Sequence, residues 1–371
     1  MIRELAAHTP VAVSRFLELV APALARPDAV YLDATVGFGG HASAVAERFS
    51  HVRIVGLDRD PDAVRRSRQR LGEAAEVEQA PFAELDEVLD RLGVPVVDAV
   101  LFDLGVSSVQ LDTDERGFAY SRDTPLDMRM DPATELTAAG ILATYTREEL
   151  ARVLRQYGEE RFAWRIAGRV VAARQTAPIT RSGELADLIR DAIPAASRRT
   201  GGNPAKRTFQ ALRVEVNSEL DQLAAARPQA IRRLRIGGRV IVMSYQSLED
   251  AQVKRVLTAG ASSSAPPGLP VEPEFARPRL RLLTRGAEGA AEAEALDNPR
   301  ARPLRLRAAE KIREIACGPR EPPTVPAGLG AAHPRRPNCE LWLRRPSRAV
   351  SRFTYRLAWL CCWGDRWWCC G

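Results

Sequence analysis

The residue types best suited to chemistry begin in a glycine-rich turn that follows the first apolar run of the chain. The turn reads Asp33-Ala-Thr-Val-Gly37-Phe-Gly39-Gly40-His41, and Asp58 lies further along. Glycines let the backbone adopt a positive φ and approach a ligand, and free amides at the start of a helix bind carboxylates or phosphates. Gly37-x-Gly39-x-x-Ala42 fits a dinucleotide fingerprint with Asp58 as its acid. Alone this signal is weak, because the same glycines could form a plain tight turn.

Three later apolar runs also end in groups that could bind a ligand. Asp58 ends the second run, Phe82 follows the third, and Asp103 and Gln110 follow the fourth. Ligands of open α/β sheets lie at the carboxyl ends of the strands, so these side chains should meet. They suit S-adenosylmethionine: Asp33 would lie near its charged amino-acid end, Asp58 would accept the ribose hydroxyls, and Phe82 would pack on adenine.

Each of these residues also has a simpler interpretation. Asp58 could merely cap the next helix, although Asp60 before Pro61 is better placed to do so. His41 could be a helix-start residue with a satisfied ring, and Phe82 could be an ordinary core ring. NAD on the glycine turn is a further alternative, but it leaves the groups after the fourth run unexplained. The joint placement of the groups favours S-adenosylmethionine.

The elements that must position these groups alternate between apolar runs and helix-like segments. Strands are expected over residues 30–34, 52–58, 77–80 and 96–104, with helices beginning near His41, Pro61 and Phe82. The last run is nearly continuous in apolar residues, as in a strand covered on both faces. The alternation predicts an α/β fold with a parallel sheet.

Helical patterns replace this alternation after Gln110. Thr146 and Glu149 form a capping box, and one-sided apolar helices are expected over residues 162–170 and 209–223. Strand-like sequence returns at residues 239–245, a helix is expected over 248–257, and 279–284 fits a final strand. We therefore expect residues 1–110 and 216–315 to form one discontinuous domain, with residues 111–215 inserted as a helical substrate-recognition domain.

The charge and the cysteines of the chain gather at its end. The chain has 54 Lys+Arg, 47 Asp+Glu and 6 Cys, for a net charge of +7. Every cysteine lies at or after Cys317, and the residues from there on carry nine arginines and three acids, a net of +6 that leaves +1 for the rest. The cysteine spacing does not match a zinc module. We interpret residues 316–371 as an atypical, nonfunctional tail.

No part of the sequence indicates a membrane span or an export signal. No stretch of about 18 uncharged apolar residues exists, and Glu4 interrupts the run that a signal peptide would need. We expect a cytoplasmic protein without metal or disulfide chemistry. The sequence leaves the oligomeric state open.

A long series of blocks resembles the bacterial 16S ribosomal RNA cytosine-N4 methyltransferase family, the MraW type, over residues 8 to about 312. The blocks include His8-Thr-Pro-Val11, the glycine turn, Gly56-Leu-Asp-Arg-Asp-Pro61, Leu101-Phe-Asp-Leu-Gly-Val-Ser-Ser108, Asp114-Glu-Arg-Gly-Phe118, Pro125-Leu-Asp-Met-Arg-Met-Asp131, Tyr157-Gly-Glu-Glu160, Arg207-Thr-Phe-Gln-Ala-Leu-Arg213, Asn217-Ser-Glu-Leu220, Ser247-Leu-Glu-Asp250 and Asn298-Pro-Arg300. So many blocks in order are far more specific than a generic Rossmann-like match.

The resemblance implies a Rossmann-like class I methyltransferase sheet with a helical insertion. It also implies a cytidine in the decoding region of 16S ribosomal RNA as substrate. The sequence leaves open whether that RNA is free or within the small ribosomal subunit. The resemblance further implies which residues contact the methyl donor: Gly39, Gly40, His41, Asp58, Phe82, Asp103 and Gln110. The family often has His where this chain has Asn203 and Arg where it has Ala251, which bears on RNA affinity. An RNA-associated protein that has lost catalysis is the alternative.

The exocyclic amine of cytosine is a poor nucleophile, so a proton acceptor is expected beside it. We assign Asp103, at the end of the fourth strand, as the catalytic acceptor. Glu249 and Asp250 are interpreted as first-turn acids of a helix rather than as active-site carboxylates. A basic segment fits phosphate binding better than a solvated helix end. Its members are Arg198, Arg199, Lys206, Arg207 and Arg213.

Overall fold

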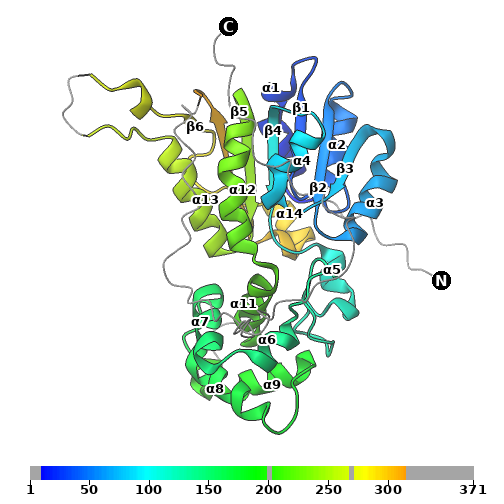
Figure 1. The fold of residues 1–371 in the computed structure, drawn as a ribbon, viewed down its shortest axis with the longest axis vertical. Helices are drawn as coiled ribbons and strands as arrows, with labels where there is room; N and C mark the ends of the chain where they lie inside the picture. Colours follow the sequence, from blue (N-terminus) through cyan, green and yellow to red (C-terminus); the bar gives the residue numbers. More distant parts are fainter. Residues whose placement is uncertain (1–9, 199–202, 267–270, 315–371) are drawn as a thin grey trace, which may run out of the picture. The chain divides into compact units, whose positions relative to one another are not determined.

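The computed structural model describes residues 10–198, 203–266 and 271–314. Seven strands form one sheet in the order β3-β2-β1-β4-β5-β7-β6 (Figure 1). Strands β1 to β5 are parallel, β7 runs antiparallel to β5, and β6 runs antiparallel to β7. The strands are β1 Val30–Asp33, β2 Arg53–Asp58, β3 Ala75–Gln79, β4 Val97–Asp103, β5 Leu234–Ser244, β6 Leu280–Leu282 and β7 Arg305–Lys311. The predicted Rossmann-like α/β sheet is confirmed.

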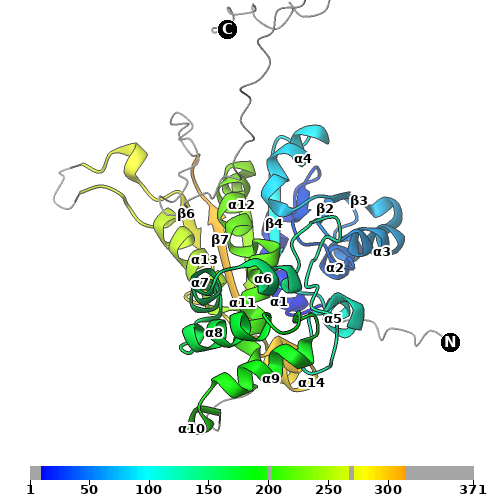
Figure 2. The same ribbon diagram turned by 60° about the horizontal axis from the view of Figure 1, so that its bottom comes forward.

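Helices cover both faces of this sheet (Figure 1 and Figure 2). Apolar side chains of α1, α2 and α3 pack in one hydrophobic core, and those of α4, α12 and α13 pack in another. Strand β4 is buried along Val97–Phe102, as its continuous apolar sequence predicts. These helices are α1 Val13–Leu24, α2 Gly40–Arg48, α3 Pro61–Leu71, α4 Leu85–Arg91, α12 Glu219–Arg233 and α13 Ser247–Gly260. Within the described part of the chain, no helix is long and apolar enough to cross a membrane.

A helical segment connects β4 to β5 and has a hydrophobic core of its own. That core draws on residues between Phe118 and Leu220, and Figure 1 shows the segment at one end of the sheet. As predicted, α7 begins at a Thr146–Glu149 capping box. The remaining helices are α5 Ser108–Asp112, α6 Ala138–Thr144, α7 Arg147–Gly158, α8 Ala163–Ala173, α9 Ser182–Ala192, α10 Ala195–Arg198, α11 Ala205–Asn217 and, after β6, α14 Glu292–Asp297.

The sheet has one strand that the sequence pattern does not reveal. The strand expected over residues 279–284 forms as β6 over Leu280–Leu282, but it is not the final strand, because β7 follows and lies between β5 and β6. The charged residues of β7 obscure the strand pattern of this segment in the sequence. In the fold Glu310 pairs with Arg239, and Lys311 donates to the carbonyl of Leu234 at 2.7 Å, so both charges are satisfied.

The helix expected over residues 209–223 is in fact two helices. Ser218 has φ +49°, which ends α11 at Asn217 and starts α12 at Glu219. A non-glycine residue in the left-handed region interrupts the helix and redirects the chain. The break lies where the chain leaves the helical segment and returns to the sheet.

Candidate active site

A cavity of about 1040 Å³ lies at the carboxyl ends of the parallel strands and extends to the helical segment. One side, here called the sheet wall, includes Gly37, Asp58, Phe82, Asp103 and Tyr245. The opposite side, here called the helical wall, includes Phe118, Tyr120, Lys206, Phe209 and Arg213. The strand ends that the sequence singles out therefore meet, and they meet beside the inserted helices.

The glycine turn is held against Asp58. Gly37 and Gly39 have φ +53° and +76°, which favour glycine. The amide of Gly37 donates to Asp58 Oδ2 at 2.9 Å, and that of Asp60 donates to Asp58 Oδ1 at 2.9 Å. Asp60, not Asp58, caps α3 by accepting from the amide of Asp62. Asp58 therefore faces the cavity with both oxygens fixed by backbone amides.

Two further glycines of the turn have different surroundings. Gly40 lines the cavity, and a Cβ there would lie 2.8 Å from Cγ of Pro10, so a larger residue would displace this contact. Gly39 is not among the cavity-lining residues, and it faces the side chains of Leu71 and Ser67 on α3. The structure thus places Gly40 at the cavity and gives Gly39 a packing role beneath it.

Two acids at the sheet wall or next to it have raised pKa values: Asp58, which lines the cavity, and Asp33, which is buried beside Ala34 and Thr35. Asp33 accepts from the Tyr31 hydroxyl at 3.0 Å, and burial, with the charges of Asp103 and Asp58, raises the pKa of Asp33 to about 7. Burial also raises the pKa of Asp58 to about 6, although its amide hydrogen bonds act in the opposite direction. Carboxylates that are costly to ionise without a partner suit a ligand that carries positive charge.

Asp103 accepts a hydrogen bond from Tyr245 and lies near His41. The Tyr245 hydroxyl donates to Asp103 Oδ1 at 3.0 Å, and His41 Nδ1 lies 3.8 Å from Oδ2. His41 is buried and its Nε2 lies 3.0 Å from the carbonyl of Val11. Burial and the nearby Asp103 raise the pKa of Tyr245 well above its usual value, so Tyr245 remains a hydrogen-bond donor.

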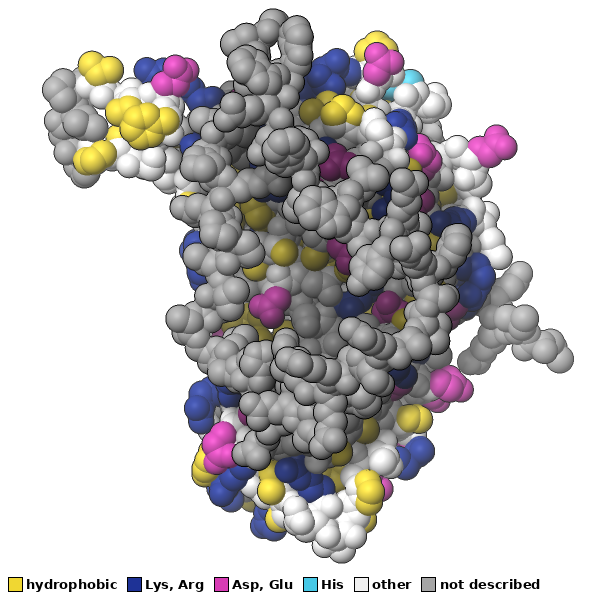
Figure 3. All heavy atoms as spheres, in the orientation of Figure 1, with side chains coloured by type: hydrophobic (Ala, Val, Ile, Leu, Met, Phe, Trp, Pro, Cys, Tyr) yellow, Lys and Arg dark blue, Asp and Glu magenta, His cyan; other side chains and the backbone are white. Residues whose placement is uncertain are grey.

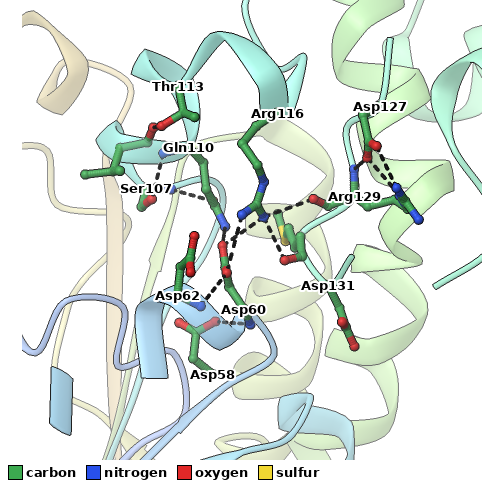
Figure 4. Close-up of polar contacts among 12 residues, drawn as sticks. Asp58, Asp60, Asp62, Ser107, Gln110, Thr113, Arg116, Asp127, Arg129 and Asp131 are labelled. Carbon is green, nitrogen blue, oxygen red and sulfur yellow. Dashed lines mark hydrogen bonds and ion pairs between the residues drawn. The ribbon is translucent and has the colours of Figure 1, made fainter. Parts of the chain in front are cut away.

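Phe82 and Gln110 also line the cavity. Phe82 lines the cavity and meets Phe102 edge to face, with 5.8 Å between ring centroids. Gln110 closes a capping box with Ser107 at the start of α5 and donates from Nε2 to Asp60 at 2.8 Å (Figure 4). Gln110 therefore positions the loop after β4 against the turn that follows β2.

Arg116 is a residue of the site that the sequence pattern does not single out, because acids surround it. Its guanidinium bridges Asp60 Oδ2, at 2.8 Å, to the carbonyls of Arg129 and Met130 (Figure 4). Arg116 and Asp60 are both largely buried. The pair joins the turn after β2 to the loop that supports the helical wall. The sequence signal that could have identified Arg116 is the Asp114-Glu-Arg-Gly-Phe118 block. The hydrogen-bond partners of Arg116 are distant in sequence, so the block alone does not show its role.

The structure separates the members of the predicted basic segment. Lys206 and Arg213 line the cavity, but Arg213 forms a buried two-bonded pair with Glu219, at 2.8 and 2.9 Å. Arg207 is exposed and donates to the carbonyl of Glu159. Arg199 and the side chain of Arg198 lie outside the described residues. Lys206 is therefore the member that presents its charge at the cavity.

The acids at the start of α13 have structural partners, as the sequence analysis expects. Glu249 is 2 % exposed and accepts from the amides of Tyr245 and Gln246, and burial raises its pKa to about 7. Asp250 pairs with Arg307, at 2.6 Å. Glu249 also lines the cavity and so contributes to its acidic character. No cluster of His, Cys, Asp and Glu that could hold a metal occurs in the described ranges.

Comparisons with known proteins agree with this geometry. The model of the MraW methylase family matches residues 5–312. Proteins called "Ribosomal RNA small subunit methyltransferase H" are similar to the chain. The one from Frankia casuarinae is 62% identical over 80% of this chain and 94% of its own length. The one from Streptomyces avermitilis is 55% identical over 83% of this chain and 98% of its own length. The chain belongs to the MraW methylase family.

Proposed function

We propose that the protein uses S-adenosylmethionine to methylate N4 of a cytidine in the decoding region of 16S ribosomal RNA. The observation that carries the proposal is the cavity itself, in which a sheet wall that carries Asp58 and Asp103 faces an inserted helical wall. The name of the relatives supports ribosomal RNA as the substrate. Small-subunit RNA, free or assembled, is the partner, and the cytoplasm is the place of action.

The sheet wall fits the methyl donor. S-adenosylmethionine, when bound, supplies an electrophilic methyl group on a positively charged sulfur. Asp58 on the sheet wall and Asp33, buried next to Ala34 and Thr35 of that wall, have raised pKa values, and a cationic ligand would stabilise their ionised forms. Asp58 would accept the ribose hydroxyls and Phe82 would pack on adenine. Gly40, with its backbone exposed to the cavity, would allow close approach, and His41, Gln110 and Gly39 would hold the surrounding loops.

Asp103 would act as the proton acceptor. The lone pair of the cytosine amine is delocalised into the ring, so the nitrogen becomes nucleophilic as it loses a proton. In the proposed step the nitrogen takes the methyl group, the bond from that carbon to sulfur breaks, and the proton passes to Asp103. The hydrogen bond from the Tyr245 hydroxyl holds the carboxylate in one orientation, which reduces the reorganisation that the step requires.

The helical segment would hold the RNA. A base inside a helix cannot reach a donor at the floor of the cavity, so the cytidine must leave its stack. Tyr120 offers a partly exposed ring on the helical wall, and Lys206 offers a charge for a phosphate. We therefore assign residues 111–215 to substrate recognition, and residues 1–110 and 216–315 to donor binding.

Two alternatives make different predictions in a binding titration. An NAD-dependent oxidoreductase would bind NAD and not S-adenosylmethionine, whereas a protein that has lost catalysis would bind the donor without transferring methyl. The test is to titrate the full chain with each ligand and to add labelled donor with small-subunit RNA or 30S particles. We expect donor binding and label in RNA. Tight NAD binding with no label in RNA would overturn the proposal.

A further inference from the structure

One face of α8 combines exposed arginines with an exposed tryptophan. Ala163, Ile166, Ala167 and Val170 bury the opposite face in the core of the helical segment. The exposed side carries Trp164, which is 44% exposed, together with arginines at helical spacing. We call this the α8 face and define it as Arg147, Arg161, Trp164, Arg165 and Arg169. Figure 3 shows Lys and Arg side chains gathered at the end of the molecule where Figure 1 places α7 and α8.

The centre of the α8 face is an ordered stack. Arg147, the first residue of α7, lies over the Trp164 ring, with Cζ 4.2 Å from the centroid. Its Nη2 lies 3.3 Å from the Trp164 carbonyl, to which it donates. A Cβ at Gly168 would lie 2.9 Å from this Nη2, so the glycine leaves room for the guanidinium. Glycine inside a helix costs about 1 kcal/mol relative to alanine, so the chain keeps this stack at a cost in helix stability.

The charges of the α8 face are not neutralised by the protein. Residues 161–183 contain five arginines and no acid. Among the described residues, no ion pair involves Arg147, Arg161, Arg165 or Arg169, whereas Arg181 nearby pairs with Asp123. Like charges four residues apart destabilise a helix by roughly 0.2–0.5 kcal/mol per pair. A row of unpaired like charges beside an exposed ring is suited to an external polyanion.

RNA fits these groups better than an acidic protein does. Guanidinium groups bind phosphates through two parallel hydrogen bonds, and a Trp ring layered with Arg offers a platform for an unpaired base. None of the residues of the α8 face lines the cavity. We infer that the α8 face is a second RNA-docking surface, separate from the cavity, which takes the phosphate backbone and one unstacked base. This inference rests on the proposed function only for the identity of RNA as the substrate.

The test compares two charge-reversed forms of the full chain. Arg165→Glu with Arg169→Glu alters the α8 face, and Arg26→Glu with Arg285→Glu is the matched control at exposed positions elsewhere. We expect the first form to bind small-subunit RNA at least tenfold more weakly. For this form, the slope of log affinity against log salt concentration should become shallower by about 0.9 for each phosphate contact removed, or by about 2 for both arginines together. The kcat at saturating RNA and the donor affinity should stay within twofold, and so should every value of the control.

A second variant separates stacking from charge. Trp164→Leu should weaken binding of single-stranded RNA about tenfold and leave the salt dependence unchanged. Equal losses in both charge-reversed forms, or unchanged RNA affinity in the first, would overturn the inference. Weaker binding to 30S particles with unchanged binding to free RNA would assign the face to a protein partner and overturn it too. If the wild-type chain transfers no methyl to RNA, the proposed function fails, while the RNA-binding result still decides the α8 face.

Discussion

The two walls of the cavity differ in charge and in how their groups are held. On the sheet wall, Asp58 accepts from backbone amides and Asp103 accepts from the Tyr245 hydroxyl, while Asp33 lies buried next to Ala34 and Thr35 of that wall. On the helical wall, rings and a lysine face the cavity, and the neighbouring α8 face carries unpaired arginines. At the boundary Arg213 and Glu219 neutralise one another. In the proposed function, the sheet wall would take the cationic donor and the helical wall the anionic RNA.

The sheet wall and the α8 face also differ in their tolerance to change. The sheet wall depends on carboxylate orientation at a few buried atoms, where a shift of about 1 Å can cost roughly a hundredfold in rate. The α8 face depends on the sum of several exposed charges, each of which contributes modestly. Single substitutions should therefore be severe on the sheet wall and mild on the helical side.

The largest effect is expected for Asp103→Asn. The amide keeps the size of the side chain but is a poor proton acceptor, so methyl transfer should fall by about 10²–10⁴. Donor affinity, measured by calorimetry, should remain unchanged because the shape of the sheet wall is preserved. Equal losses in methyl transfer and donor affinity would show that Asp103 serves the donor alone.

A smaller effect is expected for Asp58→Asn. Hydrogen bonds to charged groups contribute about 1.5–3 kcal/mol, so donor affinity should fall roughly tenfold to a hundredfold. RNA affinity should not change, because Asp58 lies on the sheet wall. The exposed Asp62, which pairs with Arg65 on the surface of α3, supplies the control as Asp62→Asn. A loss of RNA affinity in Asp58→Asn would break the division between the walls.

The link between the walls can be broken at Arg116. Removing one partner of a buried pair leaves an uncompensated charge, so Arg116→Met should lower the free energy of unfolding by about 3–5 kcal/mol. Adding Asp60→Asn should restore part of this loss, since Asn also caps a helix well. Denaturant titration of the two forms provides the measurement. A further loss in the double variant would mean that the two residues act independently.

The pH dependence of donor binding tests whether the acids at the sheet wall interact with a cationic ligand. The pKa values of Asp33 and Asp58, about 7 and about 6 in the free protein, lie above their usual range near 4. Folding stability should therefore fall as pH rises from about 4 to 7, because the folded state binds more protons there. Donor affinity should rise over pH 5–8 as the carboxylates ionise toward a cation. Calorimetry in buffers of different ionisation enthalpy should detect proton release, and proton uptake would contradict the assignment.

The smallest effect is expected at the end of the chain. The family match ends at residue 312, and residues 315–371 lie outside the described part of the structure. A chain that stops after Ile315 should keep kcat/KM within about twofold, a margin near 0.4 kcal/mol. Intact-mass measurement of the native protein tests whether the tail is present. Loss of methyl transfer on truncation would refute the proposal that the tail has no function.

Sequence patterns predicted the strand ends better than the contacts between them. Asp58 and Asp103 could be placed because parallel strands end at one edge of a sheet. The pairing of Arg213 with Glu219 and of Arg116 with Asp60 could not, because each depends on how distant segments pack. Strand β7 was missed because Glu310 and Lys311 read as polar until their partners are known. The break at Ser218 was missed because apolar spacing continues through it.

The most direct test of the account is to map the methyl group that the full chain adds to 30S particles and to free small-subunit RNA. Labelled donor, nuclease digestion and mass spectrometry would identify the modified nucleotide and the atom that carries the methyl group. We predict a single methyl group on N4 of one cytidine in the decoding region, transferred about 10²–10⁴ times more slowly by Asp103→Asn. Methylation of another base or atom, or no label in RNA with a donor-bound protein, would contradict the account.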